Sequence, residues 1–325
     1  MKVYVKTPCR LHFTLIDLNG ALGRIDGGIG VALEYPNVIL EVSERDEGIT
    51  VNVKDDRVIS IAEKILQRYK IESGVHIEIK SQIPKHVGLG STTQLLLAVA
   101  KGITTLFGIE ASVRELARIA GRGGTSGIGV AAFEGGGFIL DGGHTFGKGK
   151  QKETYLPSSA SRAPPAPLLV RYALPADWMF VVAIPNVERG AHGVREIEIF
   201  QKYCPISVDE VRILSHIILM KILPAIVEKD IASFGEGLSM IQNVGFKKVE
   251  VNLQSPLIRE LMDFMRKKGA YGAGMSSFGP AVYGVIEGYD EAIELMRKTK
   301  EFLSKIGGQV FVARANNTGA EIRVL

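Results

Sequence analysis

The chain has 325 residues, of which 46% are hydrophobic and 23% charged, and its formal net charge is +4. This composition is that of a globular protein with room for two cores, and it lacks the basic block typical of nucleic-acid or membrane binders. The two cysteines, Cys9 and Cys204, exclude a disulfide framework or a zinc cluster. Because the start has no signal-peptide pattern and the apolar runs are short, we expect a cytoplasmic protein with no membrane partner.

The first eighty residues predict a β-rich opening with one helix. Alternating or apolar segments of strand length lie at residues 2–7, 10–18, 28–34, 38–44, 49–53 and 75–81. Residues 58–70, VISIAEKILQRYK, carry the helical spacing of apolar residues instead. Helices are therefore expected to be laid against a sheet.

A glycine-rich turn follows at residues 84–94, PKHVGLGSTTQ, and the segment at 95–110 is expected to be helical. Such a turn brings unpaired backbone N–H groups and partial positive charge close to an anion. A helix that is merely capped by Ser91 is the alternative interpretation. The phosphate-binding residues predicted here are Lys85, Gly88, Gly90, Ser91, Thr92 and Thr93.

A second glycine-rich region spans residues 121–144. Ser112 and Glu115 form a capping box for the helix before it, and a short helix and a buried strand at 138–141 lie within it. Its first residues predict either a second anion site or a flexible loop between helices: Arg122, Gly123, Gly124, Thr125 and Ser126. The Pro-, Ser- and Ala-rich segment 157–167 reads as a linker or mobile loop, so we place two domains at 1–165 and 166–325.

The C-terminal half predicts an α+β layer. A buried strand at 178–185 is followed by helices up to residue 268, one of them opened by a capping box at Ser207 and Glu210. Strand, strand, helix and strand then follow at 270–277, 280–287, 290–306 and 308–315, with a further strand at 320–325. This order fits a ferredoxin-like sandwich.

Three motifs give the chain a family resemblance. Neither a P-loop nor a Rossmann fingerprint is present, but PKHVGLGST resembles the P-x-x-x-G-L-G-S-S loop of the GHMP kinases. TPCRLHFTLIDL and GAYGAGMSSFGPAVYGV stand where that family has its N- and C-terminal motifs. The resemblance implies an α+β fold of two domains, one like ribosomal protein S5 domain 2 and one ferredoxin-like, which meet at a phosphate-binding cleft.

One position departs from the kinases. Many of them carry S-G-x-D with a catalytic Asp, whereas this chain has Gly129 at the end of Ser126-Gly127-Ile128-Gly129. The segments RLHFTLIDLNGALGRIDGGIGVALE and GRGGTSGIGVAAFEGGGFILDGGH closely resemble the β-ribofuranosylaminobenzene 5'-phosphate synthases, archaeal relatives of the GHMP kinases. That resemblance implies a homodimer that joins phosphoribosyl pyrophosphate (PRPP) to 4-aminobenzoate or 4-hydroxybenzoate, with Mg²⁺, and releases pyrophosphate and carbon dioxide early in methanopterin biosynthesis.

Candidate residues for that chemistry follow from charge and position. We expect catalytic roles for Arg24, Asp26 and His12, although His12 is equally consistent with a core position. Mg²⁺ would be held by Ser91 and by a carboxylate such as Asp26. The remaining substrate-binding candidates are Arg10, His192, Arg195, Ser276 and Ser277.

Two other functions stay open on the sequence alone. An ATP-dependent small-molecule kinase of the GHMP type is disfavoured by Gly129. An RNA or protein binder is disfavoured because the chain has no basic stripe, so no nucleic-acid partner is expected. Which benzoate is used, and whether residues 157–167 form a lid, are also left open.

Overall fold

The N-terminal half forms two β-sheets in a computed structural model, which describes residues 1–191 and 193–325. The first sheet has the strand order β14-β1-β4-β6-β5, and only its β5–β6 pair is parallel. Its strands are β1 (Lys2–Lys6), β4 (Ile39–Arg45), β5 (Ile49–Val51), β6 (Gly74–Ser81) and β14 (Glu321–Val324). In β1 the side chains of Val3 and Val5 are buried, whereas Lys2 is exposed and Tyr4 and Lys6 are half-buried, which confirms the predicted alternation.

The second sheet has the order β2-β3-β7-β9, and β8 pairs with the start of β3. Its strands are β2 (Cys9–Asp17), β3 (Arg24–Leu33), β7 (Phe138–Asp141), β8 (His144–Thr145) and β9 (Leu168–Tyr172). At Gly30 of β3 an added Cβ would lie 2.6 Å from Ile128 Cγ2 and 2.4 Å from the Leu11 carbonyl oxygen. Glycine therefore lets a helix approach the sheet closely at this point.

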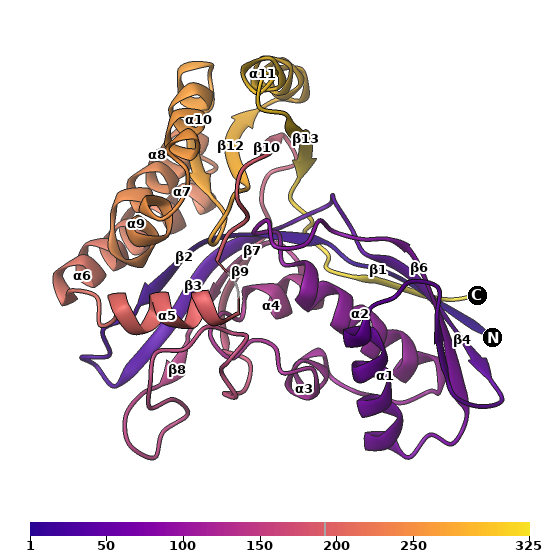
Figure 1. The fold of residues 1–325 in the computed structure, drawn as a ribbon. Coiled ribbons are helices and arrows are strands. Elements are labelled where there is room, and N and C mark those ends of the chain that lie inside the picture. The colour runs from indigo at the N-terminus through magenta and orange to yellow at the C-terminus, as the bar shows by residue number, and fades with distance from the viewer. Residues whose placement is uncertain (192) are drawn as a thin grey trace.

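Four helices lie on the concave side of the arch that the two sheets form (Figure 1). They are α1 (Asp56–Tyr69), α2 (Ser91–Leu106), α3 (Val113–Ile119) and α4 (Ile128–Gly135). Helix α2 is almost wholly buried, as its apolar sequence requires. It begins at Ser91 and not at residue 95 as predicted, so that Ser91, Thr92 and Thr93 form its first turn.

The C-terminal half contains the predicted ferredoxin-like sheet. Its order, β11-β12-β10-β13, is antiparallel throughout. The strands and the helix between the last two are β10 (Trp178–Pro185), β11 (Gly272–Met275), β12 (Val282–Glu287), α11 (Tyr289–Phe302) and β13 (Gly308–Arg314). The helices that join β10 to β11 are α5 (Val194–Tyr203), α6 (Val208–Ile217), the π-helix η1 (Ile218–Ile222), α7 (Leu223–Glu228), α8 (Ile231–Met240), the 3₁₀-helix η2 (Ile241–Asn243), α9 (Gly245–Asn252) and α10 (Pro256–Lys267).

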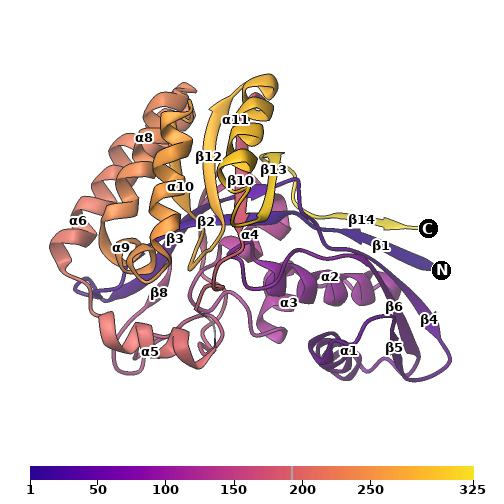
Figure 2. The ribbon, with the colours of Figure 1, turned by 45° about the horizontal axis from the view of Figure 1, so that its top comes forward.

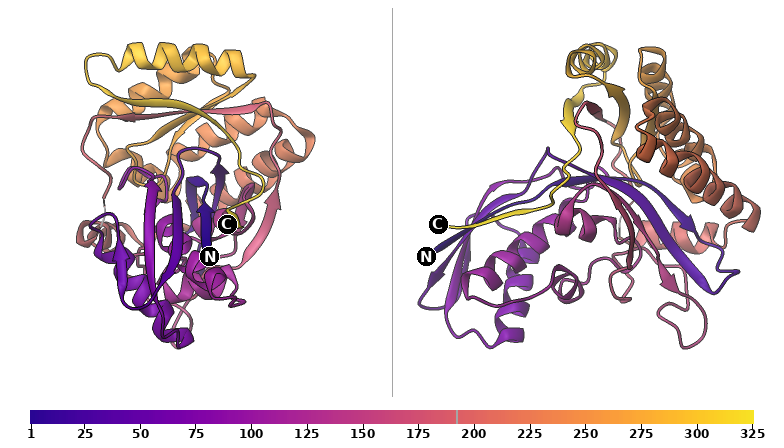
Figure 3. Two further views of the ribbon diagram at one scale, coloured as in Figure 1. Left: turned by 90° about the vertical axis from the view of Figure 1, so that its right-hand side faces the viewer. Right: turned by 180° about the vertical axis from the view of Figure 1, so that it is seen from behind.

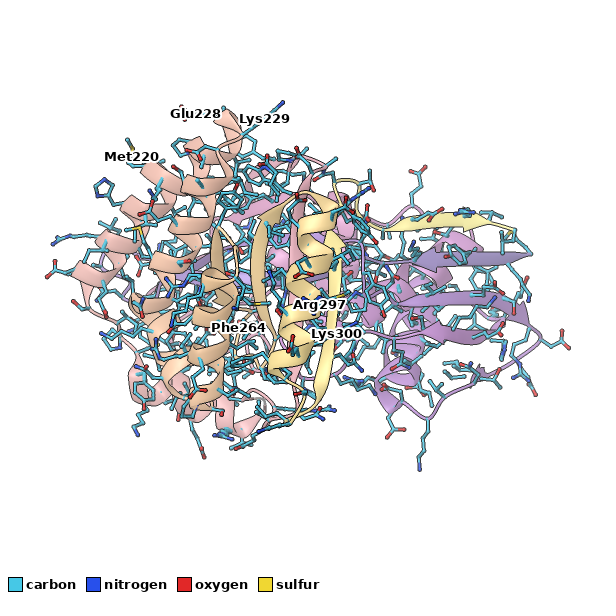
Figure 4. All side chains as sticks on the ribbon, turned by 90° about the horizontal axis from the view of Figure 1, so that it is seen from above. Met220, Glu228, Lys229, Phe264, Arg297 and Lys300 are labelled. Atoms are coloured by element: carbon cyan, nitrogen blue, oxygen red, sulfur yellow. The ribbon has the colours of Figure 1, made fainter. Side chains whose placement is uncertain are left out.

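Both faces of this sheet are covered. Met179 and Val181 of β10 pack in a cluster with α10 and α11, whereas Phe180 and Val182 face the core that includes α8. Figures 2 and 3 show the C-terminal sheet with its helices standing above the N-terminal arch, and the two termini side by side. Seen from above, α11 carries Arg297 and Lys300 on its outer surface (Figure 4). Met220 of η1, and Glu228 and Lys229 at the end of α7, lie at the upper left of the same view.

An aromatic cluster joins the two halves. Phe13 of β2 lies 5.1 Å, between ring centroids, from Tyr283 of β12 and 6.4 Å from Phe234 of α8. Phe138 of β7 lies 6.3 Å from Phe234, which in turn stacks 5.0 Å from Trp178. Because aromatic pairs at these separations are attractive and these rings are wholly buried, the two halves share one core.

The predicted boundary at residue 165 does not separate the sheets cleanly. Strand β9 lies beyond it yet pairs with β7, and β14 at the C-terminus pairs with β1. The segment 157–167, expected to be a linker or a mobile loop, is partly packed: Ser161 and Ala166 are buried, and Arg114 donates to the Ala166 carbonyl at 3.0 Å. Of the helices in the described part of the chain, none has the length and apolar character that crossing a membrane requires.

Candidate active site

The turn before α2 has the conformation of an anion cradle. Gly88 and Gly90 both adopt left-handed backbone angles, with φ of 92° and 80°, and Gly90 is the N-cap of α2. No side chain caps this helix start, so its first N–H groups are directed at the space in front of the turn. The predicted cradle is thus present in the fold.

The C-terminal glycine-rich motif packs against the cradle. The Ser276 hydroxyl donates to the Gly88 carbonyl at 2.7 Å and accepts from the His12 backbone N–H at 2.9 Å. Arg10 also donates to the Gly88 carbonyl. A Cβ at Gly88 would lie 2.3 Å from the Ser276 carbonyl oxygen, so only glycine fits between the two segments. The buried Ser276 therefore positions the turn and does not face a ligand.

Two adjoining cavities, each of about 140 Å³, open beside the cradle. The first, here called the loop cavity, is bounded by the cradle from Gly88 to Thr93 and by Gly279. The second, the inner cavity, reaches down to His12, Leu15 and Phe200. Both share the walls Arg10, Thr93, Arg122, Glu196, Ser277 and Phe278.

The shared wall carries two arginines. Burial lowers the pKa of Arg10 to about 10 and also lowers the pKa of Arg122. The charge of Arg122 adds to the lowering at Arg10 and that of Arg57 to the lowering at Arg122, whereas Glu196 of the same wall opposes both. Both nevertheless remain protonated at neutral pH. Arg122 is held in place because its Nε donates to Thr93 Oγ1 at 3.0 Å. Two half-buried cations beside a helix N-terminus make this wall a site for a phosphate or carboxylate.

The inner cavity combines apolar walls with one unusual histidine. Leu15, Phe200 and Phe278 give it a surface suited to an aromatic ring. The side chain of His12 is buried, and among the described residues neither of its ring nitrogens has a hydrogen-bond partner. Burial, with Arg10 and Lys247 nearby, holds the pKa of His12 well below its usual value, so the ring is neutral. A buried polar group without a partner is rare in a folded protein, so its place in a cavity wall makes His12 a candidate for a functional role.

A buried ion pair behind this cavity was missed by the sequence analysis. Lys247 and Glu250 of α9 contact each other, and Lys247 also donates to the Ser277 carbonyl at 3.1 Å. Burial lowers the pKa of Lys247 and raises that of Glu250, and Glu250 lines the inner cavity. Charges three residues apart in the otherwise helical FKKVEVN resemble an ordinary surface pair, which is why the pattern gave no signal.

Most of the predicted binding residues are brought together. Those on the cavity walls are Arg10, His12, Gly88, Gly90, Ser91, Thr92, Thr93, Arg122, Gly123, Thr125, Ser126 and Ser277. Pro157, Ser158 and Ser159, from the segment predicted as a linker, form another part of the inner wall.

Three more of the predicted binding residues lie outside the two cavities. Lys85 is turned to Asp55, with which it forms an ion pair at 2.9 Å, and is absent from both cavities. Gly124 is covered because its carbonyl accepts from Ser161. Arg195 contacts Glu188 and lines a neighbouring cavity. His192 lies outside the described residues.

Asp26 requires a correction. Its carboxylate accepts from Lys152 Nζ at 3.0 and 3.1 Å and contacts His144 Nδ1 at 2.6 Å, and all three side chains are buried. Asp26 lines neither cavity and both its oxygens are bonded, so it is a structural anion and not the predicted metal ligand or catalytic group. Arg24 is also absent from the cavity walls and donates to the Gly142 carbonyl at 2.7 Å; its catalytic role stays a prediction of the sequence motif.

Asp141 beside this cluster predicts a pH effect on stability. Burial raises the pKa of its carboxyl to about 7, although N–H groups of Gly127 and Gly143 donate to it at 2.9 and 3.0 Å. Between a pH of about 4 and that value the folded protein keeps a proton that the unfolded chain releases. As the pH rises through this range, the unfolding free energy should therefore fall by up to roughly 1 kcal/mol per pH unit. Urea unfolding of the wild type and Asp141→Asn should show this slope in the wild type alone; parallel curves would contradict it.

Comparisons with known proteins agree with this architecture. The chain matches the model of the GHMP kinases N terminal domain over residues 56–137 and that of the GHMP kinases C terminal over residues 222–305. The solved homoserine kinase of Cytophaga hutchinsonii superposes with a TM-score of 0.71 at 18% identity, over 99% of this chain and 97% of its own. The predicted α+β fold of the GHMP kinases is therefore confirmed.

Higher identity is found to enzymes named for another activity. The curated beta-ribofuranosylphenol 5'-phosphate synthase of Methanothermobacter thermautotrophicus is 44% identical over 98% of this chain and 98% of its own length. The enzyme of the same name from Methanocaldococcus jannaschii is also 44% identical, over 98% of this chain and 99% of its own. The homoserine kinase of Methanococcus maripaludis strain S2 is 28% identical over only 52% of this chain and 54% of its own.

Proposed function

Because this chain belongs to the family of the beta-ribofuranosylphenol 5'-phosphate synthases, we propose that it transfers the ribosyl phosphate of PRPP to a 4-substituted benzoate. The ring would be joined to ribose through carbon, with release of carbon dioxide and pyrophosphate. The relatives are named for a ribofuranosylphenol, so 4-hydroxybenzoate is the first substrate to test and 4-aminobenzoate the second.

The observation that carries this proposal is the wall common to both cavities. A diphosphate in the loop cavity would receive N–H groups from the turn at Gly88 to Ser91 and charge from Arg10 and Arg122. These groups favour the diphosphate most when it departs and its negative charge grows. An aromatic acid in the inner cavity would meet the same two arginines with its carboxylate.

The kinase alternative is disfavoured at Gly129. A Cβ there would lie 3.2 Å from Thr93 Cγ2, and the Gly129 carbonyl accepts from Gln94 Nε2 at 2.8 Å. A side chain at this position would therefore require Thr93 to shift by a few tenths of an ångström. Phosphoryl transfer does not strictly need that base, but glycine offers no carboxylate to an alcohol here.

The residues support transfer at carbon in three ways. The arginines neutralise the leaving group, so that the C1–O bond of ribose breaks toward an oxocarbenium-like centre. The walls Leu15, Phe200 and Phe278 exclude water that would capture this centre. The carboxyl-bearing carbon of the ring faces the loop cavity and attacks C1, and loss of carbon dioxide restores aromaticity.

Magnesium fits the loop cavity as a companion of the diphosphate. In the described part of the chain no group of three or more His, Cys, Asp or Glu side chains is placed to hold a metal. Mg²⁺ keeps waters and prefers substrate phosphate oxygens, so the Ser91 hydroxyl on the cavity wall is the protein ligand we propose. Bound there, the ion would add positive charge to the leaving diphosphate. A homodimer, as the family resemblance implies, is part of the same proposal.

The test is decarboxylation that depends on PRPP. Purified protein with Mg²⁺, PRPP and carboxyl-labelled 4-hydroxybenzoate should release labelled carbon dioxide and pyrophosphate in equal amounts. Chelation of Mg²⁺ should stop both. Label that stays in the acid, under conditions where ATP is split in the presence of an alcohol, would refute the proposal and favour a kinase.

A further inference from the structure

We propose that His12 takes the proton of the para hydroxyl of 4-hydroxybenzoate while the ring attacks ribose, and gives it back after carbon dioxide leaves. This inference rests on the proposed function and assigns one group of the site a separate task. It distinguishes the two candidate acids, because only the hydroxy acid has to lose a proton.

The imidazole of His12 is buried and has no hydrogen-bond partner among the described residues. The His12 backbone N–H donates to the Ser276 hydroxyl at 2.9 Å and its carbonyl accepts from Ser277 at 2.9 Å, so the main chain is fixed on both sides. The imidazole itself lies in the wall of the inner cavity without a hydrogen bond from any described residue. Nε2 lies close to Gly28 of β3, where an added Cβ would be 3.3 Å from it, so the ring packs against the sheet at a position where glycine avoids a steric clash.

The order of residues along β2 fits a para-substituted ring. Arg10 borders both cavities, whereas His12 borders only the inner one. Residues two positions apart in a strand, such as Arg10 and His12, point to the same face and are separated by about 7 Å. A ring whose carboxylate meets Arg10 therefore extends its opposite end, the para position, toward His12.

The proton leaves the acceptor and returns to it within one turnover. As the ring carbon bonds to C1 of ribose, the C1–O bond breaks and its electron pair leaves with pyrophosphate. The phenolic O–H proton moves to a ring nitrogen of His12, and the acceptor becomes a neutral dienone that still carries its carboxylate. The C–CO₂ bond then breaks and its electron pair restores the ring as a phenolate, which takes the proton back from His12. No oxidant, reductant or net proton is needed.

Charges in the site assist the transfer. The imidazole is neutral in the free protein, so it can accept a proton. Bound diphosphate and carboxylate add negative charge beside Arg10, and this charge stabilises the imidazolium that forms. With 4-aminobenzoate the nitrogen lone pair supplies the electrons and an iminium forms, so no proton has to leave before carbon dioxide does.

The experiment compares both acids on the same preparation of His12→Gln. We expect kcat/KM for 4-hydroxybenzoate to fall about 10²-fold or more, and that for 4-aminobenzoate to fall less than about 10-fold. The ratio between the acids is independent of the fraction of protein that is folded. His12→Asn should show the same ratio. The matched control is His76→Gln on β6. The imidazole of His76 forms a hydrogen bond with Thr50, and His76 lines neither cavity.

Equal losses with both acids, or no loss with either, would overturn the role of His12. Failure of the underlying function would look different, because the wild-type protein would then turn over neither acid with PRPP. A solvent deuterium isotope effect on the wild type adds a second readout. It should be present with 4-hydroxybenzoate and near unity with 4-aminobenzoate, and effects of equal size would also contradict the proposal.

Discussion

Replacing Arg10 with Met is expected to lower kcat/KM for PRPP about 10³-fold. Arg10 serves both cavities at once, because it donates to the Gly88 carbonyl and borders the shared wall. The variant removes charge from the departing diphosphate and loosens the turn that supplies its N–H groups. Steady-state rates of carbon dioxide release at varied PRPP would measure the loss.

Two further variants give this result its meaning. Arg10→Lys keeps the charge but loses the guanidinium fork, so it should fall between the wild type and Arg10→Met. Arg118→Met removes an exposed arginine of α3 that borders neither cavity and should leave kcat/KM within about twofold of the wild type. If Arg10→Met were as active as Arg118→Met, the shared wall would not be the diphosphate site.

Asp26→Asn is expected to lower the unfolding free energy by about 3–5 kcal/mol. The variant leaves the buried Lys152 ammonium facing an amide where the carboxylate accepted at 3.0 and 3.1 Å. Asp26 has φ of 68°, a left-handed conformation that asparagine tolerates well, so the effect reports charge and not backbone strain. Guanidinium unfolding of both proteins at one pH would measure it.

The double variant Asp26→Asn with Lys152→Met is the matched control. Removing both charges should recover a large part of the lost stability, because no uncompensated buried ion is left. Lys152 also donates to Thr125 Oγ1 and to the Leu156 carbonyl, at 3.1 Å each, so recovery should be incomplete. An Asp26→Asn protein as stable as the wild type would mean that Asp26 does not have the structural role assigned here.

Local patterns were sufficient for most of the elements and for the cradle. The alternation in β1 and the helical spacing in α1 reflect a repeat of side-chain directions that the backbone imposes, whatever the rest of the fold does. Glycines next to hydroxyl residues before an apolar helix require the same turn in any context where the backbone must approach an anion. Even so, the start of α2 was placed four residues late, since the hydroxyl residues of its first turn resemble loop.

The pairing of distant charges could be decided only by the tertiary structure. Asp26 and Lys152 are 126 residues apart, and nothing in GRIDGG indicates that a lysine from a later loop neutralises its carboxylate. Likewise, His12 and the pair Lys247–Glu250 meet at one cavity because β2, α9 and the C-terminal motif pack together. Periodicity fixes which face of an element a side chain occupies, but its electrostatic role depends on which charges the fold brings within a few ångströms, and Coulomb interactions in a poorly solvated interior are strong only at such short range.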